Sequence, residues 1–305
     1  MSLKCIFFIP AAGKGTRLSP LTDNYCKPSI PIKVNSAGKI TRMIEIPLHI
    51  SQVLGSMAIV TASYKKEKLE FIRRRKNIIF ITLKDPDFNT ALIKCENIIK
   101  ASGAQILCYL PADTLVPVSV VKDMINSIDD TMLAVLLCTR EQRDHNLRKR
   151  NKRGFLSREN FEVELCGDLG VYVININRFY KEKVKSSNFD IVKCWEMGKA
   201  ESLVKIHIPS PDIPYVDIGT PLTLWEVIRK LNKENIDKNG NILFPGAYIH
   251  ESSKNVIALP NSNSLNIPLS NCIIPEERVV TSAKEVLHIP FVKRDYFDNS
   301  TICNL

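Results

Sequence analysis

Short apolar runs alternate with longer amphipathic stretches over the first two-thirds of the 305-residue chain. Apolar runs of this length predict buried strands, and the three-to-four-residue spacing between them predicts helices. We expect strands at Cys5–Pro10, Met57–Thr61, Ile78–Leu83, Ile106–Leu110, Thr131–Thr139, Gly154–Leu156 and Gly170–Asn175. We expect helices at Thr41–Leu54, Lys65–Arg75, Asn89–Ser102, Val118–Ser127 and Pro221–Asn232. This order predicts an α/β fold with a mainly parallel sheet that helices cover on both faces.

The pattern changes after Leu231, where the chain becomes polar and reaches an Asn-Gly-Asn turn signal at 239–241. We therefore expect a main domain over residues 1–232, a linker over 233–241 and a β-rich region over 242–305. Two sets of apolar residues recur every six positions in the last region: Ile267, Ile273 and Val279, and Ile274, Val280 and Val286. A hexapeptide repeat is typical of a β-helix, and chance recurrence is the alternative for so short a stretch.

Composition is that of a globular protein, with 45% hydrophobic and 24% charged residues. No apolar run approaches the length of a membrane span, so we expect no membrane partner. The run Cys5–Ala12 is too short for a signal peptide and leads into a glycine-rich turn, which favours a first buried strand. The nine cysteines are scattered and form no Cys-x-x-Cys pair, which favours a reducing compartment. The expected location is the cytoplasm.

The net charge of +10 is compatible with anionic partners but does not identify them. Arg73–Lys76 ends a helical pattern and Arg148–Arg153 precedes a glycine, and neither run has interleaved aromatic residues. We interpret the first as a solvated helix end and the second as a solvated loop. Charge alone is the argument for a nucleic acid, so we expect none as partner.

Candidate chemistry is concentrated in the segment Gly13–Thr22, directly after the first strand. Glycines let the backbone turn sharply and approach a ligand, and successive N–H groups in such a loop form an anion site. Arg17 adds a guanidinium that can grip two phosphate oxygens. Lys27 brings a second cation in a segment that prolines stiffen. One strand, one nest of amides and two cations predict a triphosphate site.

Two other glycine loops compete with this interpretation. A Rossmann dinucleotide loop requires Gly-x-Gly-x-x-Gly at the start of a helix, but here Arg17 and Leu18 interrupt the pattern and Pro20 follows. A Walker A loop closes with Gly-Lys-Ser or Gly-Lys-Thr, which the segment lacks. An ordinary glycine turn remains the third alternative, and the full run Gly13–Ile32 argues against it.

The run Gly-Lys-Gly-Thr-Arg-Leu-Ser-Pro-Leu-Thr at 13–22, followed by Lys-Pro-Ser-Ile-Pro-Ile at 27–32, resembles the signature of the sugar-1-phosphate nucleotidyltransferases. The resemblance extends to about residue 232. Arg42–Leu48 with Ala58–Tyr64 is similar to the ADP-glucose pyrophosphorylases, and the family also includes the mannose-1-phosphate guanylyltransferases. It implies a Rossmann-like fold and an enzyme that joins a nucleoside triphosphate to a sugar 1-phosphate and releases pyrophosphate.

The resemblance also assigns roles to individual residues. It implies that Arg17 and Lys27 are catalytic phosphate contacts, and that Asp113 and Asp217 hold Mg²⁺. It places the nucleotide at Ala11, Ala12, Gly13, Gly15, Thr16, Thr90 and Ala91. It places the sugar phosphate at Gly154, Asp168 and Gly170, where a bend at the start of a strand is an equally good interpretation.

The residues themselves agree with a metal at Asp113. It follows an apolar strand, and α/β folds bind ligands outside the carboxyl ends of strands. Asp113 and Asp217 are each also helix-cap candidates. Carboxylate ligands suit Mg²⁺, which keeps waters and shares substrate phosphates. With such a site, in-line attack by the sugar-phosphate oxygen on the α-phosphorus needs no general base.

One departure from the family concerns the acceptor. Relatives carry a Glu-Lys-Pro whose lysine binds the sugar phosphate, and residues 155–169 contain no such tripeptide. Lys152, Arg153 or Arg158 is a candidate replacement. The alternatives are a catalytically silent nucleotide- or sugar-phosphate-binding regulator, and a cytidylyltransferase with a non-sugar acceptor such as phosphocholine. A homo-oligomer through the C-terminal region is a further candidate partner arrangement.

Overall fold

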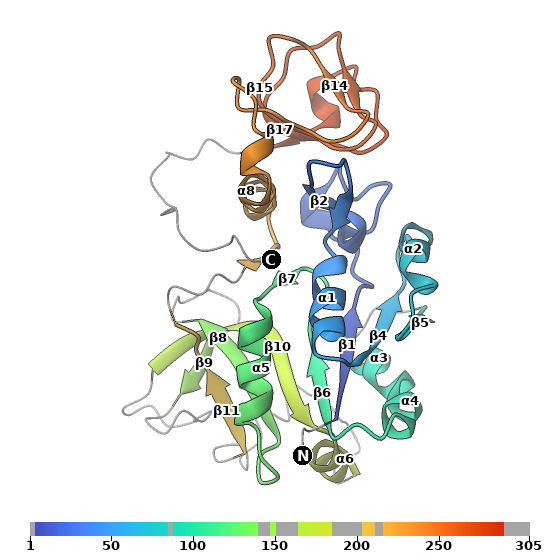
Figure 1. Ribbon diagram of the computed structural model, residues 1–305, viewed down its shortest axis with the longest axis vertical. Helices are drawn as coiled ribbons and strands as arrows, with labels where there is room; N and C mark the ends of the chain where they lie inside the picture. Colours follow the sequence, from blue (N-terminus) through green and yellow to red (C-terminus); the bar gives the residue numbers. More distant parts are fainter. Residues whose placement is uncertain are drawn as a thin grey trace. The chain divides into compact units, whose positions relative to one another are not determined.

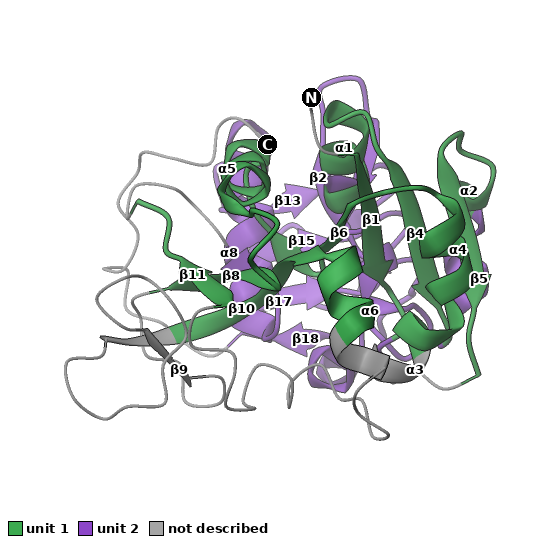
Figure 2. Cartoon of the chain, turned by 90° about the horizontal axis from the view of Figure 1, so that it is seen from below, with its two compact units in different colours: residues 1–12, 47–63, 71–215 green, residues 13–46, 64–70, 216–305 purple. Residues whose placement is uncertain are grey.

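The computed structural model describes residues 4–84, 88–139, 147–150, 164–184, 203–210 and 216–289 (Figure 1). The chain divides into two compact units (Figure 2). Unit 1 comprises residues 1–12, 47–63 and 71–215, and unit 2 comprises residues 13–46, 64–70 and 216–305. Each unit draws on segments far apart in the sequence. The expected domain boundary between residues 232 and 242 stays a prediction, because contacts define a compact unit and independent folding defines a domain.

Unit 1 is built on an eight-stranded sheet with the order β11-β8-β10-β6-β1-β4-β5, and β9 pairs with β10. Its strands are β1 (Cys5–Pro10), β4 (Met57–Ala62), β5 (Ile78–Thr82), β6 (Ile106–Tyr109), β8 (Ala134–Thr139), β9 (Leu147–Arg150), β10 (Glu164–Asn175) and β11 (Val204–His207). β1 is parallel to both β4 and β6, β4 to β5, and β11 to β8. The antiparallel pairs in the described sheet all involve β10. The predicted mainly parallel α/β fold is confirmed.

Helices cover both faces of this sheet (Figure 2). They are α1 (Glu45–Val53), α2 (Glu70–Arg73), α3 (Phe88–Lys94), α4 (Glu96–Ala101), α5 (Val118–Ser127) and α6 (Ile176–Val184). One buried cluster joins Leu92, Ile99 and Phe179 of α3, α4 and α6 to Phe8 and Leu107 of the sheet. Burying these side chains supplies the main driving force for assembly of the unit.

Three expected helices differ from the structure for local reasons. The one expected from Thr41 starts at Glu45, because Ile40–Arg42 pairs as strand β3 with β2. The helix expected over Lys65–Arg75 is a 3-10 turn followed by one turn of α2, because Lys65 has a left-handed backbone with φ of 52°. The helix expected over Asn89–Ser102 divides at Cys95 into α3 and α4.

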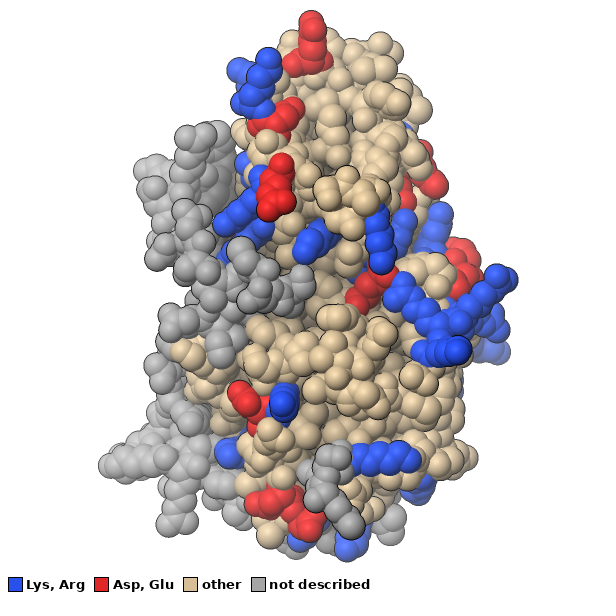
Figure 3. Space-filling model, viewed as in Figure 1, with Lys and Arg blue, Asp and Glu red and all other residues tan. Residues whose placement is uncertain are grey.

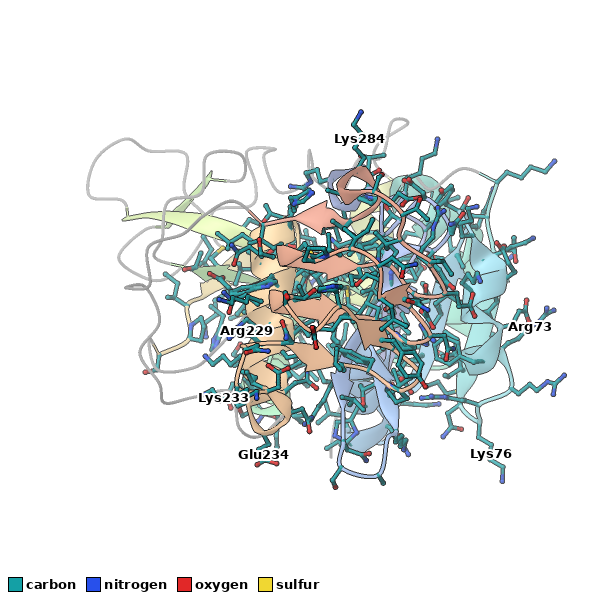
Figure 4. All side chains as sticks on the ribbon, turned by 90° about the horizontal axis from the view of Figure 1, so that it is seen from above. Arg73, Lys76, Arg229, Lys233, Glu234 and Lys284 are labelled. Carbon is teal, nitrogen blue, oxygen red and sulfur yellow. The ribbon has the colours of Figure 1, made fainter. Side chains whose placement is uncertain are left out.

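Other expected bounds agree closely. The helix Val118–Ser127 and the strand Cys5–Pro10 have the predicted ends. The strand expected from Thr131 begins at Ala134, because Asp129 holds the backbone of Thr131 and Met132 in a turn. The expected strand Gly154–Leu156 lies outside the described residues. Arg73–Lys76 is exposed, and Figure 4 shows the labelled Arg73 and Lys76 directed away from the ribbon.

Unit 2 contains short elements from both ends of the sequence. They are β2 (Pro31–Val34), β3 (Ile40–Arg42), β12 (Val216–Asp217) and α8 (Pro221–Leu231), with 3-10 turns at Thr16–Leu18, Lys27–Ser29, Lys66–Leu69 and Lys233–Asn235. Strand β7 (Thr114–Leu115) belongs to unit 1. Buried Asn232 joins distant segments of unit 2: its amide donates to the Ile32 carbonyl (2.9 Å) and its oxygen accepts from the Val34 N–H (2.8 Å).

The C-terminal stack, residues 242–288, is β-rich as predicted. Its strands are β13 (Ile242–Leu243), β14 (Tyr248–Ile249), β15 (Lys254–Ala258), β16 (Asn263–Ser264), β17 (Ser270–Ile274) and β18 (Leu287–His288). Ile242 pairs in parallel with Ile257, and Ile257 pairs with Ile273, so each of these pairings marks one full coil of the chain. Parallel coils of this kind form a β-helix-like stack.

The two hexapeptide sets behave differently in this stack. Ile274, Val280 and Val286 all belong to its buried core. In the other set, Val279 is 68% exposed while Ile273 is fully buried. The six-residue interval therefore joins three buried positions in one set only.

No helix in the described parts of the chain is long and apolar enough to cross a membrane. Lysine and arginine side chains are spread over the surface in Figure 3, with a group of them on the exposed run Arg73–Lys76.

Candidate active site

The sheet of unit 1 has a topological switch point between β1 and β6. The chain proceeds from β1 to β4 and β5 on one side, then returns to β6 on the other side of β1. Ligands of open α/β sheets bind outside the carboxyl ends of strands at such a point. Buried Ala11 and Ala12 follow β1, and half-buried Asp113 follows β6. The structure thus brings three of the predicted residues to the position where a ligand is expected.

An aromatic row crosses three neighbouring strands of the sheet, β1, β6 and β10. The rings of Phe8, Tyr109 and Tyr172 stack with centroid separations of 5.9 Å and 5.4 Å. Burial raises the pKa of Tyr109, and the negative charges of Asp113 and Asp168 raise it further. The two aspartates therefore act on the same phenol, which stays protonated at neutral pH.

Asp168 lies on a bulge of β10 rather than at the start of a strand. Its pairing with Cys138 is followed by the pairing of Tyr172 with Leu136, so two extra residues intervene on β10. Its carboxylate accepts from the Gly170 N–H (2.8 Å) and from the Tyr172 hydroxyl (3.2 Å). A bulge re-aims side chains, and here it fixes the carboxylate next to the backbone turn.

Gly170 is at the centre of that bulge. Its φ of +72° is a left-handed conformation, and a Cβ placed on it would lie 3.7 Å from Pro111 Cγ. The bulge and the segment that carries Asp113 are therefore neighbours. Within unit 1, Asp113, Asp168 and Gly170 form one polar group at the carboxyl end of the sheet.

The glycine-rich loop of unit 2 is held by short-range contacts. Gly15 has φ of 67° and the next residues form a 3-10 turn, Thr16–Leu18, in place of an α-helix. The Leu18 N–H and the Thr22 hydroxyl both donate to the Gly15 carbonyl, at 2.9 Å and 3.0 Å. A left-handed residue followed by right-handed ones turns successive N–H groups to one side, which makes a nest for an anion.

Lys27 packs directly against this loop. A Cβ placed on Gly15 would lie only 2.9 Å from the Lys27 Cβ. Lys27 is 8% exposed, so its side chain is held by its surroundings instead of moving freely in solvent. Gly13, in contrast, is exposed and has open space at its Cβ position. The loop thus combines a restrained cation with an accessible stretch of backbone.

The other predicted cation, Arg17, and the predicted metal ligand Asp217 both lie close to Gly219. A Cβ on Gly219 would lie 3.3 Å from both terminal nitrogens of Arg17 and 3.4 Å from Asp217 Oδ2. The turn that holds them is fixed by buried Ile218 and by Thr220, which caps α8 in a capping box with Thr223. Thr220, and not Asp217, is therefore the N-cap of α8.

Other predicted positions are less informative. Thr16 is exposed at the start of its 3-10 turn. Thr90 is in α3, where only the backbone is described, and the side chain of Ala91 is buried in the sheet core. Gly154, Lys152, Arg153 and Arg158 lie outside the described residues. Their predicted roles stay predictions.

The donor chemistry at the two aspartates fits Mg²⁺. The described residues contain no cluster of three or more His, Cys, Asp or Glu side chains that could hold a metal. Asp113 and Asp217 are partly exposed carboxylates that follow or end short strands. Mg²⁺ binds through one or two carboxylates with waters and substrate phosphates, so it does not require a larger cluster.

Sequence reasoning missed Tyr109, Tyr172 and Gly219. The tyrosines look like ordinary strand residues, and only the register of β6 and β10 brings them together. Gly219 is two residues from the predicted metal ligand Asp217, but its proximity to Arg17 joins two segments that are far apart in the sequence. Cys26, a buried residue beside Lys27, has a pKa raised by burial and does not supply a reactive thiol.

Comparisons with known proteins support the resemblance that the sequence motifs indicate. Residues 8–146 match the family model for nucleotidyl transferases. No curated protein sequence matches the chain. Among solved structures, the fold is similar to a mannose-1-phosphate geranyltransferase from Thermus thermophilus, with a TM-score of 0.61, 14% identity and 95% of each chain covered. Over residues 8–146 this chain is therefore similar to the nucleotidyl transferases.

Proposed function

We propose that the protein joins a nucleoside triphosphate to a sugar 1-phosphate and releases pyrophosphate. The observation that carries this proposal is the convergence of Arg17 and Asp217 on Gly219, in the unit that also holds the Gly15 nest and Lys27. A guanidinium, an ammonium, a carboxylate and a nest of backbone N–H groups are the parts that phosphoryl transfer requires.

Each side chain has a role that its surroundings support. The exposed guanidinium of Arg17 would neutralise the charge that develops on the leaving pyrophosphate. Lys27, restrained against the loop, would bind the phosphates near the reacting centre. The nucleophile is an oxygen of the sugar phosphate and is already anionic. It would attack the α-phosphorus in line with the bond to pyrophosphate, so positioning and charge stabilisation suffice.

Asp113 and Asp217 are the residues that would hold Mg²⁺. When bound, the ion would neutralise charge on the reacting phosphates. Each carboxylate is partly exposed, which suits Mg²⁺ because substrate oxygens and waters complete its coordination.

The acceptor side is the less determined half of the site. The carboxylate of Asp168 would repel a phosphate, so its suitable partner is a sugar hydroxyl, which can donate a hydrogen bond. A carboxylate offers several lone pairs, so oxygens that accept from Gly170 and Tyr172 can also accept from a ligand. An acceptor with hydroxyl groups is therefore favoured over phosphocholine, which has no sugar hydroxyl to donate.

The test is a matrix of five nucleoside triphosphates (ATP, GTP, CTP, UTP and dTTP) against sugar 1-phosphates and phosphocholine, with Mg²⁺. Pyrophosphate release is the readout. We expect one pair to turn over, with Asp113→Asn and Asp217→Asn each reducing its rate by about a thousandfold. Asp123→Asn, a change of an exposed aspartate on α5, is the matched control and should retain the wild-type rate.

The absence of a Glu-Lys-Pro tripeptide favours one other function, a nucleotide-binding regulator without catalysis. Binding of a triphosphate with no turnover on any acceptor would support that function and exclude the transferase. If CTP and phosphocholine are the one pair that turns over, the acceptor is phosphocholine and not a sugar 1-phosphate.

A further inference from the structure

The coils of the C-terminal stack turn through left-handed residues at two corners. Gly240, Asn255 and Asn271 form the first corner, and Gly246, Asn261 and Glu277 form the second. The residues at each corner recur once per coil, at the same intervals as the paired strands. Within each coil the second corner follows the first by six residues.

Glu277 is the exception among these corners. Glycine and asparagine tolerate a positive φ, whereas a glutamate at φ of 57° is in a sparsely populated conformation. Such a residue persists where its surroundings hold it in place. The carboxylate of Glu277 accepts a hydrogen bond from the Tyr25 hydroxyl, and Lys68 lies 3.9 Å from it.

Tyr25 is suited to be a permanent donor in this contact. Burial raises the pKa of its hydroxyl, and the hydrogen bond to Glu277 and the charges of Glu276 and Glu277 raise it further. The Lys68 ammonium also lies 4.2 Å from the centroid of its ring. The contact therefore joins Tyr25, two positions before Lys27, to the coil that contains Glu277.

Glu276 acts on the other side of Lys27, through Arg42 and the carbonyl of Ser29. It is 8% exposed and accepts two hydrogen bonds from Arg42, at 2.9 Å and 3.0 Å. The same Arg42 guanidinium donates to the Ser29 carbonyl at 2.5 Å. A guanidinium can satisfy a carboxylate and a carbonyl together because its donors are fixed in a plane.

The segment between these two contacts cannot hold its own shape. Lys27–Ser29 is a single 3-10 turn, with the Ser29 and Ile30 N–H groups donating to the carbonyls of Cys26 and Lys27. One helical turn is unstable by itself, since it fixes several dihedral angles for very few hydrogen bonds. Its geometry therefore depends on contacts with residues elsewhere in unit 2.

We propose that Glu276 and Glu277 are positioning residues for Lys27, which they hold from both sides through Arg42 and Tyr25. The proposal rests on the phosphate-binding role proposed above for Lys27. It gives the C-terminal stack a part in the reaction through the geometry of Lys27 and not through contact with substrate. The two glutamates belong to one coil, so a single coil restrains both ends of the segment.

The first test measures the restraint on Lys27 without any substrate. The intact protein is treated briefly with acetic anhydride, and acetylation of Lys27 is compared by mass spectrometry with that of exposed Lys14. Glu276→Gln removes one of the two acceptors for Arg42. Glu277→Asn installs the residue that the preceding coil uses at this corner, so the backbone is accommodated while the contact with Tyr25 is lost.

We expect the ratio of Lys27 to Lys14 acetylation to rise about fivefold in each variant, the effect of losing roughly one stabilising contact. Glu285→Gln is the matched control, because Glu285 accepts bonds from the Thr281 and Ser282 N–H groups in the same stack and these bonds do not involve the Lys27 segment. An unchanged ratio in both test variants, or an equal rise in the control, overturns the proposal.

The second test separates positioning from general loss of structure. Kd is measured by calorimetry for the triphosphate that wild type binds best, in wild type and in Lys27→Ala, each with and without Glu276→Gln. Glu276→Gln should weaken binding about tenfold in wild type and have no effect in Lys27→Ala, since coupled residues are not additive. Equal weakening in both backgrounds would show a structural role and overturn the proposal.

Failure of the two proposals has different signatures. A wild-type protein that binds no triphosphate refutes the proposed function, and Lys27 then has no ligand to be positioned for. A protein that binds triphosphate, and whose Lys27 is acetylated at the same rate in all variants, refutes the positioning role alone.

Discussion

The two segments that carry the predicted phosphate contacts are held in different ways. The loop Gly15–Leu18 is fixed by its own hydrogen bonds and by Thr22, a few residues away. The turn Lys27–Ser29 is fixed by residues remote in sequence, since Arg42 donates to its Ser29 carbonyl and is itself bound by Glu276. The Ile30 carbonyl also accepts from the Met43 N–H and the Pro28 carbonyl from the Ile44 N–H.

This difference separates the two cations. Arg17 is exposed and extends from a self-supporting loop, so changes elsewhere in unit 2 should leave it in place. Lys27 is buried and belongs to a segment that depends on other segments, so changes in the C-terminal stack should reach it. Four experiments can break or refine this contrast, and the one with the greatest expected effect comes first.

Arg17→Ala should lower kcat/KM by about a thousandfold, because the charge on the leaving pyrophosphate loses its partner. The free energy of unfolding should change by less than about 0.5 kcal/mol, because the side chain is exposed. Pyrophosphate release and urea unfolding measure the two quantities. Arg74→Ala, at an exposed arginine in the run after α2, is the control. A large loss of stability in Arg17→Ala would contradict the view that the loop supports itself.

Asn232→Asp should destabilise the protein by about 3 kcal/mol, since a buried carboxylate would face the carbonyls of Ile32 and Ile228. Asn232 anchors the strand that follows the Lys27 segment, so triphosphate affinity should fall together with stability. Urea unfolding and calorimetry test this, with Asn24→Asp at an exposed position as the control for added charge. If stability falls while affinity is retained, the Lys27 segment is less dependent on its surroundings than we infer.

Gly15→Ala should weaken triphosphate binding roughly tenfold, because the new methyl group would meet Lys27 at 2.9 Å. The positive φ adds a backbone cost of about 1–2 kcal/mol. Gly55→Ala is a matched control: it has φ of +63° and no atom within 4 Å of the added Cβ. The control should share the loss of stability and keep wild-type affinity. Equal affinities in the two variants would count against the packing of Gly15 on Lys27.

Tyr25→Phe and Tyr64→Phe form the mildest pair, each losing about 1 kcal/mol or less with one hydroxyl. Tyr25 bonds Glu277 beside the Lys27 segment, whereas Tyr64 bonds the Thr22 carbonyl at 3.1 Å beside the glycine loop. Acetylation of Lys27 should rise in Tyr25→Phe and stay unchanged in Tyr64→Phe. The reverse result would show that Tyr64, and not Tyr25, restrains the Lys27 segment, and would contradict our assignment.

Elements with local signals could be predicted from the amino-acid order alone. The apolar runs predicted β1, β4, β5 and β6 within about a residue, because a buried strand is recorded in consecutive side chains. The loop Gly13–Thr22 could be recognised for the same reason, since a nest of N–H groups needs glycine and its neighbours within a few positions. The predicted roles of individual site residues remain to be tested by the experiments above.

Contacts between distant residues, in contrast, became visible only in the folded chain. The bulge at Asp168, the convergence of Arg17 and Asp217 on Gly219, and the contacts of Glu276 and Glu277 all join segments whose separation is not encoded in any local period. The coil length of the C-terminal stack was likewise hidden, since it follows from strand pairing and not from the six-residue recurrence. Side-chain periodicity reports which face of an element is buried, whereas register and side-chain contact depend on how the elements pack.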